Sequence, residues 1–170
     1  MKQSFARKLS PLFIAPMLLL SFTVLTDKAN FSGSWALNEG KSDFGQRGAR
    51  FATKTLKVEQ KDDAINITRT TPSFNGGDDV TTTDALGFDG KEVQSTGFGN
   101  STKKSTLKWA DDGQGFTITS NTTMERNGQT FELSGTETWS LTDGGKSLSV
   151  VSVSKSSRGE FTAKAVYDKQ

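Results

Sequence analysis

The residues with the clearest chemical potential are charged side chains on the apolar faces of predicted strands. Glu137 lies within the longest alternating run, on the same face as the apolar positions of that run, and Arg69, Asp84 and Lys103 hold equivalent positions in three other runs. Because alternate residues of a strand point to opposite faces, all four are predicted to point inward. An unpaired buried charge costs several kcal/mol, so buried charges require partners, and these two cations and two anions balance in sign.

Hydroxyl and aromatic residues share these inward faces. A few polar groups among aromatic walls are typical of a pocket that hydrogen-bonds the head group of a ligand. One alternative is that some of the polar positions are exposed strand ends. The other is that the aromatic residues, which also include Phe116, Phe161 and Tyr167, belong to the core and do not line a cavity. The predicted ligand-binding residues are Glu137, Arg69, Asp84, Lys103, Ser105, Thr122, Trp109, Trp139 and Phe131.

The composition excludes several kinds of catalytic site. The chain contains no His and no Cys, so thiol nucleophiles, imidazole bases, disulfides and zinc sites built from these residues are impossible. Adjacent Asp pairs begin at positions 62, 78 and 111, but they fall in predicted turns, where Asp is favoured by hydrogen bonds to its own backbone. We therefore predict no enzyme, no catalytic residue, no metal site and no cofactor.

The elements that must position these residues are short strands joined by tight turns. From Phe31 onward apolar and polar residues alternate with a period of two, which is typical of half-buried strands. Clusters rich in Gly, Asp and Asn separate the runs at 61–63, 76–78, 89–90, 112–113, 127–128, 143–145 and 158–159. These turns predict at least eight antiparallel strands and leave room only for short helices. A change of face at Val150 and Val151 predicts a β-bulge.

A meander of this kind must protect its two edges, and closure into a barrel removes them. An eight-stranded barrel has an interior just wide enough for side chains or one small ligand. The alternative is a two-layer β-sandwich, whose Greek-key connections need longer crossings, and only residues 38–52 form an obvious one. We therefore predict an all-β fold, an antiparallel up-and-down meander closed into a barrel of about 8–10 strands.

The N-terminal segment is predicted to be a secretory signal peptide. Lys2, Arg7 and Lys8 precede a mostly apolar stretch at 9–25, which is the layout of such a peptide. The stretch is short for a membrane span, which needs about 20 apolar residues, and an uncleaved anchor is the alternative. We therefore predict a signal peptide at 1–29, with the exact cut left open, and a barrel domain at 30–170 that is exported to the periplasm or the extracellular space.

Removal of that segment changes the charge of the chain. Residues 1–29 carry a net charge of +3, so the +2 of the full chain becomes about −1 for residues 30–170. Such a domain lacks the basic surface that nucleic-acid binding requires. We predict no nucleic-acid partner, and contact with a membrane only through the targeting segment.

The first predicted strand carries a resemblance to a known family. Phe31–Ser32–Gly33–Ser34–Trp35 resembles the opening G-x-W segment of lipocalin-like (calycin) barrels. The stretches 41–45, 89–92, 139–146 and 166–170 are also similar to a group of small secreted bacterial proteins of this type. The resemblance implies a lipocalin-like barrel with an interior cavity, closed at one end by the Trp. The chain lacks a T-D-Y motif, and Arg158 and Lys164 are the candidates for the basic residue that accompanies this Trp in the family.

Three functions are compatible with the sequence. The first is a secreted or periplasmic barrel that carries a small hydrophobic or amphipathic ligand in its interior. The second is a non-catalytic structural or protein-interaction domain of the cell envelope that uses its outer face, which is rich in Ser and Thr. The third is an enzyme that uses carboxylates, Lys, Tyr or hydroxyls, which the lack of His and Cys makes the least favoured. We expect the first.

Overall fold

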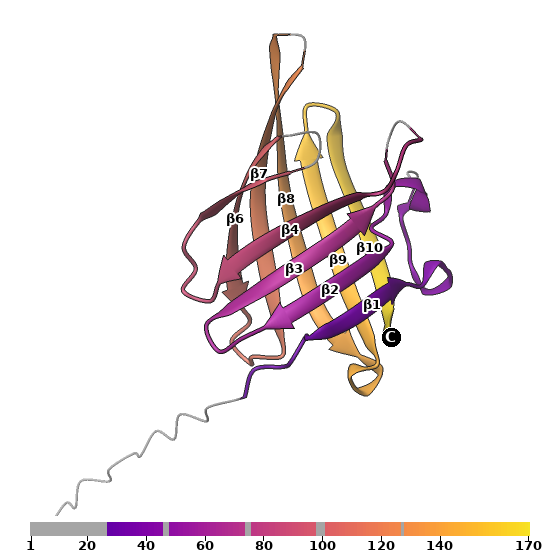
Figure 1. Cartoon of the computed structure of the whole chain (residues 1–170), viewed down its shortest axis with the longest axis vertical. Coiled ribbons are helices and arrows are strands. Elements are labelled where there is room, and N and C mark those ends of the chain that lie inside the picture. The colour runs from indigo at the N-terminus through magenta and orange to yellow at the C-terminus, as the bar shows by residue number, and fades with distance from the viewer. Residues whose placement is uncertain (1–26, 46–47, 74–75, 98–100, 127) are drawn as a thin grey trace, which may run out of the picture.

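The computed structural model describes residues 27–45, 48–73, 76–97, 101–126 and 128–170 (Figure 1). Their strands are β1 (Gly33–Leu37), β2 (Thr55–Gln60), β3 (Ala64–Thr71), β4 (Val80–Gly87), β5 (Val93–Thr96), β6 (Thr102–Trp109), β7 (Gly115–Arg126), β8 (Gln129–Thr142), β9 (Ser147–Ser156) and β10 (Gly159–Lys169). Short 3-10 helices occur at η1 (Glu39–Lys41), η3 (Ala49–Phe51) and η5 (Asp143–Gly145). Within these residues, no helix has the length and apolar character to cross a membrane.

The strands form one antiparallel sheet that curls into a nearly closed barrel (Figure 1). The order is β4-β3-β2-β1-β10-β9-β8-β7-β6-β5, so the first strand pairs with the last. The two ends of this order, β4 and β5, meet at a seam that side chains bridge: Ser95 on β5 donates a hydrogen bond of 3.1 Å to Asp84 on β4. The predicted meander is therefore confirmed, and a sandwich of two layers is excluded.

One end of the barrel is filled by an apolar core. Trp35 and Trp139 are its largest fully buried side chains, and the Trp35 Nε1 donates to the backbone oxygen of Phe31 at 3.1 Å. The buried core residues are Phe31, Trp35, Leu56, Val58, Ile65, Ile67, Leu86, Leu107, Phe116, Ile118, Trp139, Leu148, Val150 and Tyr167. Since this core is continuous around the barrel wall, the end that contains Trp35 is solid.

The basic residue that accompanies Trp35 is Lys169, rather than either candidate from the sequence. The Lys169 Nζ lies 5.2 Å from the centroid of the Trp35 ring, a cation–π geometry. Because β1 pairs with β10 with Trp35 opposite Lys169, the last strand brings this cation to the ring. A Cβ at Gly33, whose φ is 145°, would lie 3.0 Å from the Lys169 Cε, so glycine suits this position.

One local prediction, the β-bulge, is wrong. The pairing of β9 with β10 runs without interruption from Ser147 to Ser156, so there is no bulge at Val150 and Val151. The change of face arises because Val151 is an exposed apolar residue on the outer surface. The long segment at 38–52 joins the neighbouring strands β1 and β2 and is not a Greek-key crossing.

Candidate ligand-binding site

Four charged residues form one chain of ion pairs across the barrel interior, which we call the ionic layer: Arg69, Glu137, Asp84 and Lys103. The Arg69 Nη2 lies 2.9 Å from the Glu137 Oε2, and its Nε lies 3.5 Å from the Asp84 Oδ2. The Lys103 Nζ lies 2.7 Å from the same Asp84 oxygen. The structure therefore pairs the two predicted cations with the two predicted anions.

The register of the strands explains why these residues meet. Arg69 on β3 is the next inward position after the buried Ile67, which lies opposite Asp84 of β4. Glu137 on β8 lies opposite the buried Ile118 of β7. Each charge thus borders the apolar core, and the ionic layer marks the level at which that core ends.

Trp139 links the core to the ionic layer. Its Nε1 donates a hydrogen bond of 3.0 Å to the Glu137 Oε2, the oxygen that Arg69 also contacts. The Arg69 guanidinium lies 5.3 Å from the centroid of the Trp139 ring. These contacts orient the Arg69 and Glu137 side chains relative to each other, because a guanidinium pairs with carboxylates and stacks on rings in fixed geometries.

The ionic layer shifts the pKa values of Arg69 and Asp84. Burial alone would lower the pKa of Arg69, but Glu137 and Asp84 raise it, so the guanidinium is always charged. Burial alone would raise the pKa of Asp84, yet Arg69, Lys103 and the hydrogen bond from Ser95 lower it below its ordinary value. Asp84 is therefore ionised throughout the physiological pH range, and the pairing persists across that range.

Tyr167 of β10 is buried beside these charges. Burial raises the pKa of its phenol to about 12, with a further increase from Glu137, while Arg69 and a hydrogen bond with Thr53 act in the opposite direction. The phenol is thus neutral at physiological pH and keeps a proton that it can donate in a hydrogen bond.

Beyond the ionic layer the barrel is hollow. A cavity of about 510 Å³, which we call the larger cavity, lies against β8, β9, β10 and the segment between β1 and β2. Its size falls within the range of about 300–1,000 Å³ that is typical of small-molecule sites. It is lined by Phe44, Gly48, Ala52, Thr53, Arg69, Glu137, Val150, Ser152, Ser154, Glu160, Phe161, Thr162, Ala163, Ala165 and Tyr167.

Small side chains explain why this part of the barrel is empty. Ser152 on β9 lies opposite Ala163 on β10, and it also lies opposite Glu137 on β8. Ser154 continues the same inward face of β9 and lies opposite Gly135 of β8. At the solid end the corresponding positions carry Trp, Leu and Phe, so the cavity follows from the change in side-chain size along each strand.

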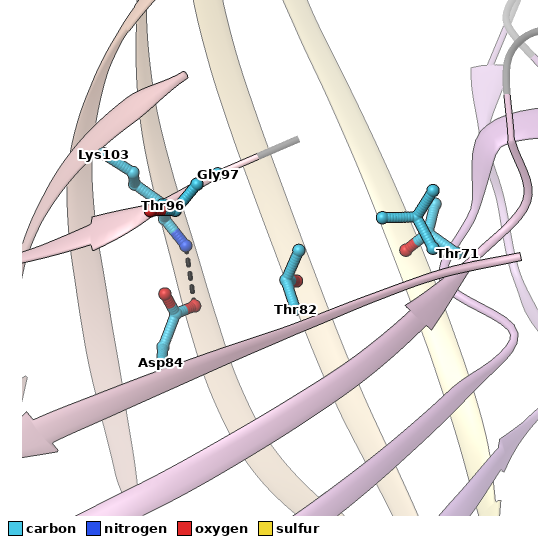
Figure 2. Close-up of a pocket in the computed structure, with 7 residues that line it drawn as sticks. Thr71, Thr82, Asp84, Thr96, Gly97 and Lys103 are labelled. Atoms are coloured by element: carbon cyan, nitrogen blue, oxygen red, sulfur yellow. Dashed lines mark hydrogen bonds and ion pairs between the residues drawn. The ribbon is translucent and has the colours of Figure 1, made fainter. Parts of the chain in front are cut away.

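A smaller cavity of about 200 Å³ lies at the seam between β4 and β5 (Figure 2). In Figure 2 the Lys103 side chain reaches toward Asp84, with Thr82 and Thr71 beside the gap. The lining residues are Thr71, Val80, Thr82, Asp84, Thr96, Gly97 and Lys103. The ion pair between Arg69 and Asp84 separates the two cavities, because Arg69 lines the larger one and Asp84 lines the smaller one.

The other predicted residues line neither of the two cavities. Thr122 is half-buried and lies opposite Lys103. Ser105 is buried near the ionic layer, and its Oγ has no hydrogen-bond partner among the residues that the structure describes. Trp109 packs in the aromatic cluster of the solid end, with ring centroids 5.9 Å from Phe31 and 5.4 Å from Phe116. Trp109 therefore belongs to the core.

Phe131 lies away from both cavities. Its side chain is 38% exposed, on the part of β8 that extends with β7 beyond the rest of the barrel (Figure 1). Phe131 does lie on the same face of β8 as Leu133 and Glu137, as the alternation predicts. However, the hairpin of β7 and β8 extends past the other strands, so this face has no barrel interior at the level of Phe131. The structure therefore does not bring Phe131 to the site.

The sequence prediction missed the lining residues supplied by the segment between β1 and β2. Phe44, Ala52 and Thr53 lie in this segment, which lacks the period of two that identified the strands. A backbone bridge between Asp43 and Lys164 holds the segment against β10, with N–O distances of 2.7 and 2.8 Å. The sequence offered no signal for this contact.

The order of the described strands and the cavity define an antiparallel up-and-down β-barrel that is nearly closed. No known protein family and no curated protein matches the sequence. Among solved structures, the chain is similar to the crystal structure of zebrafish ileal bile acid-binding protein complexed with cholic acid. The TM-score is 0.49 and the sequence identity 15%, over 82% of this chain and 98% of that chain. This identity is too low to transfer a ligand.

Proposed function

We propose that the protein is a non-enzymatic barrel that binds a small, partly apolar molecule in its larger cavity. The observation that carries this proposal is an interior space of about 510 Å³ whose lining combines apolar side chains with charged and hydroxyl groups. Phe44, Val150 and Phe161 supply apolar surface, and Arg69 and Glu137 supply polar contacts. A partly apolar ligand gains from burial against such walls and is oriented by the polar groups.

Binding of the uncharged fluorophore Nile red tests this function. We expect saturable binding to the unchanged protein and a loss of affinity of about tenfold or more in Ser152→Trp, because the indole occupies the cavity. Val151→Trp is the matched control, since this neighbouring residue is exposed on the outer face. Equal affinity in the two variants, or no saturable binding to the unchanged protein, would overturn the proposal.

We also propose that the chain is exported to the periplasm or the extracellular space. The support is the charged and apolar layout of residues 1–29, of which residues 1–26 lie outside the described part of the chain. Cell fractionation combined with the intact mass of the protein in each fraction tests this. Recovery of the full-length chain in the cytosolic fraction alone would contradict export.

One observation favours the second function, a non-catalytic interaction domain. Met124 of β7 and Phe131 of β8 lie opposite each other on the projecting hairpin, and both are exposed. Exposed apolar residues that are adjacent across a hairpin mark a contact surface more often than scattered ones do. A second copy of the chain is the partner that can be tested directly.

A further inference from the structure

The charged residues that line the larger cavity do not favour a ligand that carries a carboxylate. Within the described residues, its charged lining consists of Arg69, Glu137 and Glu160. The one cation, Arg69, already pairs with two carboxylates, those of Glu137 and Asp84. No positive charge in this lining is therefore left to compensate an acidic ligand.

Glu137 is the charge of the ionic layer that an occupant of the cavity reaches most readily. Its side chain is 30% exposed, compared with 12% for Arg69, 6% for Asp84 and 18% for Lys103. Its hydrogen bonds with Arg69 and Trp139 both use Oε2. The other oxygen, Oε1, is therefore available in the described structure to accept a hydrogen bond from a ligand.

We propose that the larger cavity selects amphipathic ligands whose head group donates hydrogen bonds, an amine or an alcohol, over ligands that carry a carboxylate. This proposal rests on the function proposed above. A donor head group satisfies the Glu137 Oε1 and leaves the ion pair with Arg69 in place. An alcohol can in addition accept a hydrogen bond from the neutral phenol of Tyr167, which lines the same cavity.

A carboxylate faces two unfavourable arrangements at this site. If it replaces Glu137 on Arg69, the Glu137 carboxylate becomes an unpaired charge in a partly buried position. If it binds beside Glu137, two like charges lie close together where screening by solvent is weak. Both arrangements cost free energy that an amine or an alcohol does not.

Competition against bound Nile red at neutral pH tests the proposal with three probes of equal chain length: decylamine, decanol and decanoate. At this pH the amine is a cation and the acid an anion. On the unchanged protein we expect decylamine and decanol to displace the dye at concentrations about tenfold or more below those that decanoate requires. Equal or better displacement by decanoate would overturn the selectivity while leaving the binding function intact. Failure of Nile red itself to bind would instead overturn the function.

Substitution of Glu137 identifies the residue responsible. In Glu137→Gln we expect decanoate to gain about tenfold and decylamine to lose its advantage, because Arg69 is left with a free hydrogen-bonding edge and the competing carboxylate is gone. Glu132→Gln, on the exposed outer face of the same strand, is the control and should keep the order of the unchanged protein. An unchanged order in a folded Glu137→Gln would overturn the role of this residue. The competition on the unchanged protein stands without any variant.

Discussion

At the scale of single residues, the pKa of Tyr167 tests how well its phenol is shielded from solvent where the apolar core borders the larger cavity. It is the one tyrosine of the chain, so a spectrophotometric titration of phenol ionisation follows a single group. We expect a pKa of about 12 in the folded protein, because burial disfavours the phenolate. In denaturant the same group should titrate near its ordinary value of 10.0.

The sign of this shift fixes a pH dependence of stability. Between pH 10 and 12 the unfolded chain loses the phenolic proton before the folded one does, so the free energy of unfolding falls as the pH rises through this window. The contribution of Tyr167 is on the order of 2 kcal/mol. Denaturant unfolding in this range checks the prediction, and Tyr167→Phe should show a shallower decrease. A pKa of 10 in the folded state would show that the phenol is open to solvent.

The ionic layer is better explained by the cavity than by stability. Replacement of a buried ion pair by well-packed apolar residues is often neutral or stabilising, so the pairing of Arg69 with Glu137 is not required for a solid barrel. The pair does place hydrogen-bonding groups at the boundary between core and cavity. We interpret the pair as the boundary between the apolar core and a cavity whose lining mixes apolar and polar side chains.

At the scale of the elements, the projecting hairpin of β7 and β8 is expected to be dispensable for the fold. Met124 and Phe131 are 36% and 38% exposed and lie outside the apolar core. We expect Met124→Thr and Phe131→Thr, singly or together, to change the free energy of unfolding by no more than about 0.5 kcal/mol each. Denaturant unfolding checks this, with Ile118→Thr on the buried part of β7 as a destabilising control.

The same variants distinguish the two proposed functions. If the hairpin mediates self-association, sedimentation should show a dimer in the unchanged protein and a monomer in the double variant. If the protein is a ligand carrier only, Nile red affinity and sedimentation should both be the same in the two proteins. Loss of dye binding in the double variant would contradict the placement of Phe131 outside the site.

The alternation of apolar and polar residues along the sequence was enough to predict the meander and the charged members of the site. Glu137 and Arg69 could be assigned to the interior because each interrupts an otherwise apolar face, and such an interruption is visible without coordinates. Phe131 was wrongly predicted to bind a ligand, because the alternation gives the face on which a residue lies but not its position along the barrel axis. The contribution of Phe44 was invisible, because it depends on a loop that folds back onto β10.

At the scale of the whole molecule, the alternating sequence pattern could not predict the seam between β4 and β5. Among the described residues, the sheet runs from β4 through β1 and β10 to β5, so β4 and β5 are its two edge strands although they are consecutive in the sequence. Asp84 bridges this seam through Lys103 and Ser95, and it also holds Arg69. One buried carboxylate therefore connects the seam of the barrel to Arg69 in the lining of the larger cavity.

The segment just before the first strand also belongs to the folded barrel. The Ala29 N–H donates to the Gly113 oxygen at 2.9 Å, and the Gln60 Nε2 donates to the Ala29 oxygen at 3.0 Å. The Lys28 Nζ lies 4.6 Å from the centroid of the Phe88 ring and 5.2 Å from that of Trp109. These contacts pack residues 28 and 29, which precede β1, against the apolar end of the barrel.

Removal of these residues is therefore expected to weaken the barrel. A chain that begins at Asn30 loses the two hydrogen bonds of Ala29, the longer one from Gln114 to the Asp27 oxygen and the cation–π contacts of Lys28, relative to a chain that begins at Asp27. Together these contacts are worth about 2 kcal/mol. We expect a melting temperature lower by about 5 °C, measured by circular dichroism. Lys28→Ala in the longer chain should reproduce only the cation–π share of this loss. If the proposed export includes a cleavage that keeps the contacts of Lys28 and Ala29, the mature chain should begin at or before Lys28, and its intact mass shows this directly. Equal melting temperatures for the two chains would mean that the cut after residue 29 costs the barrel nothing.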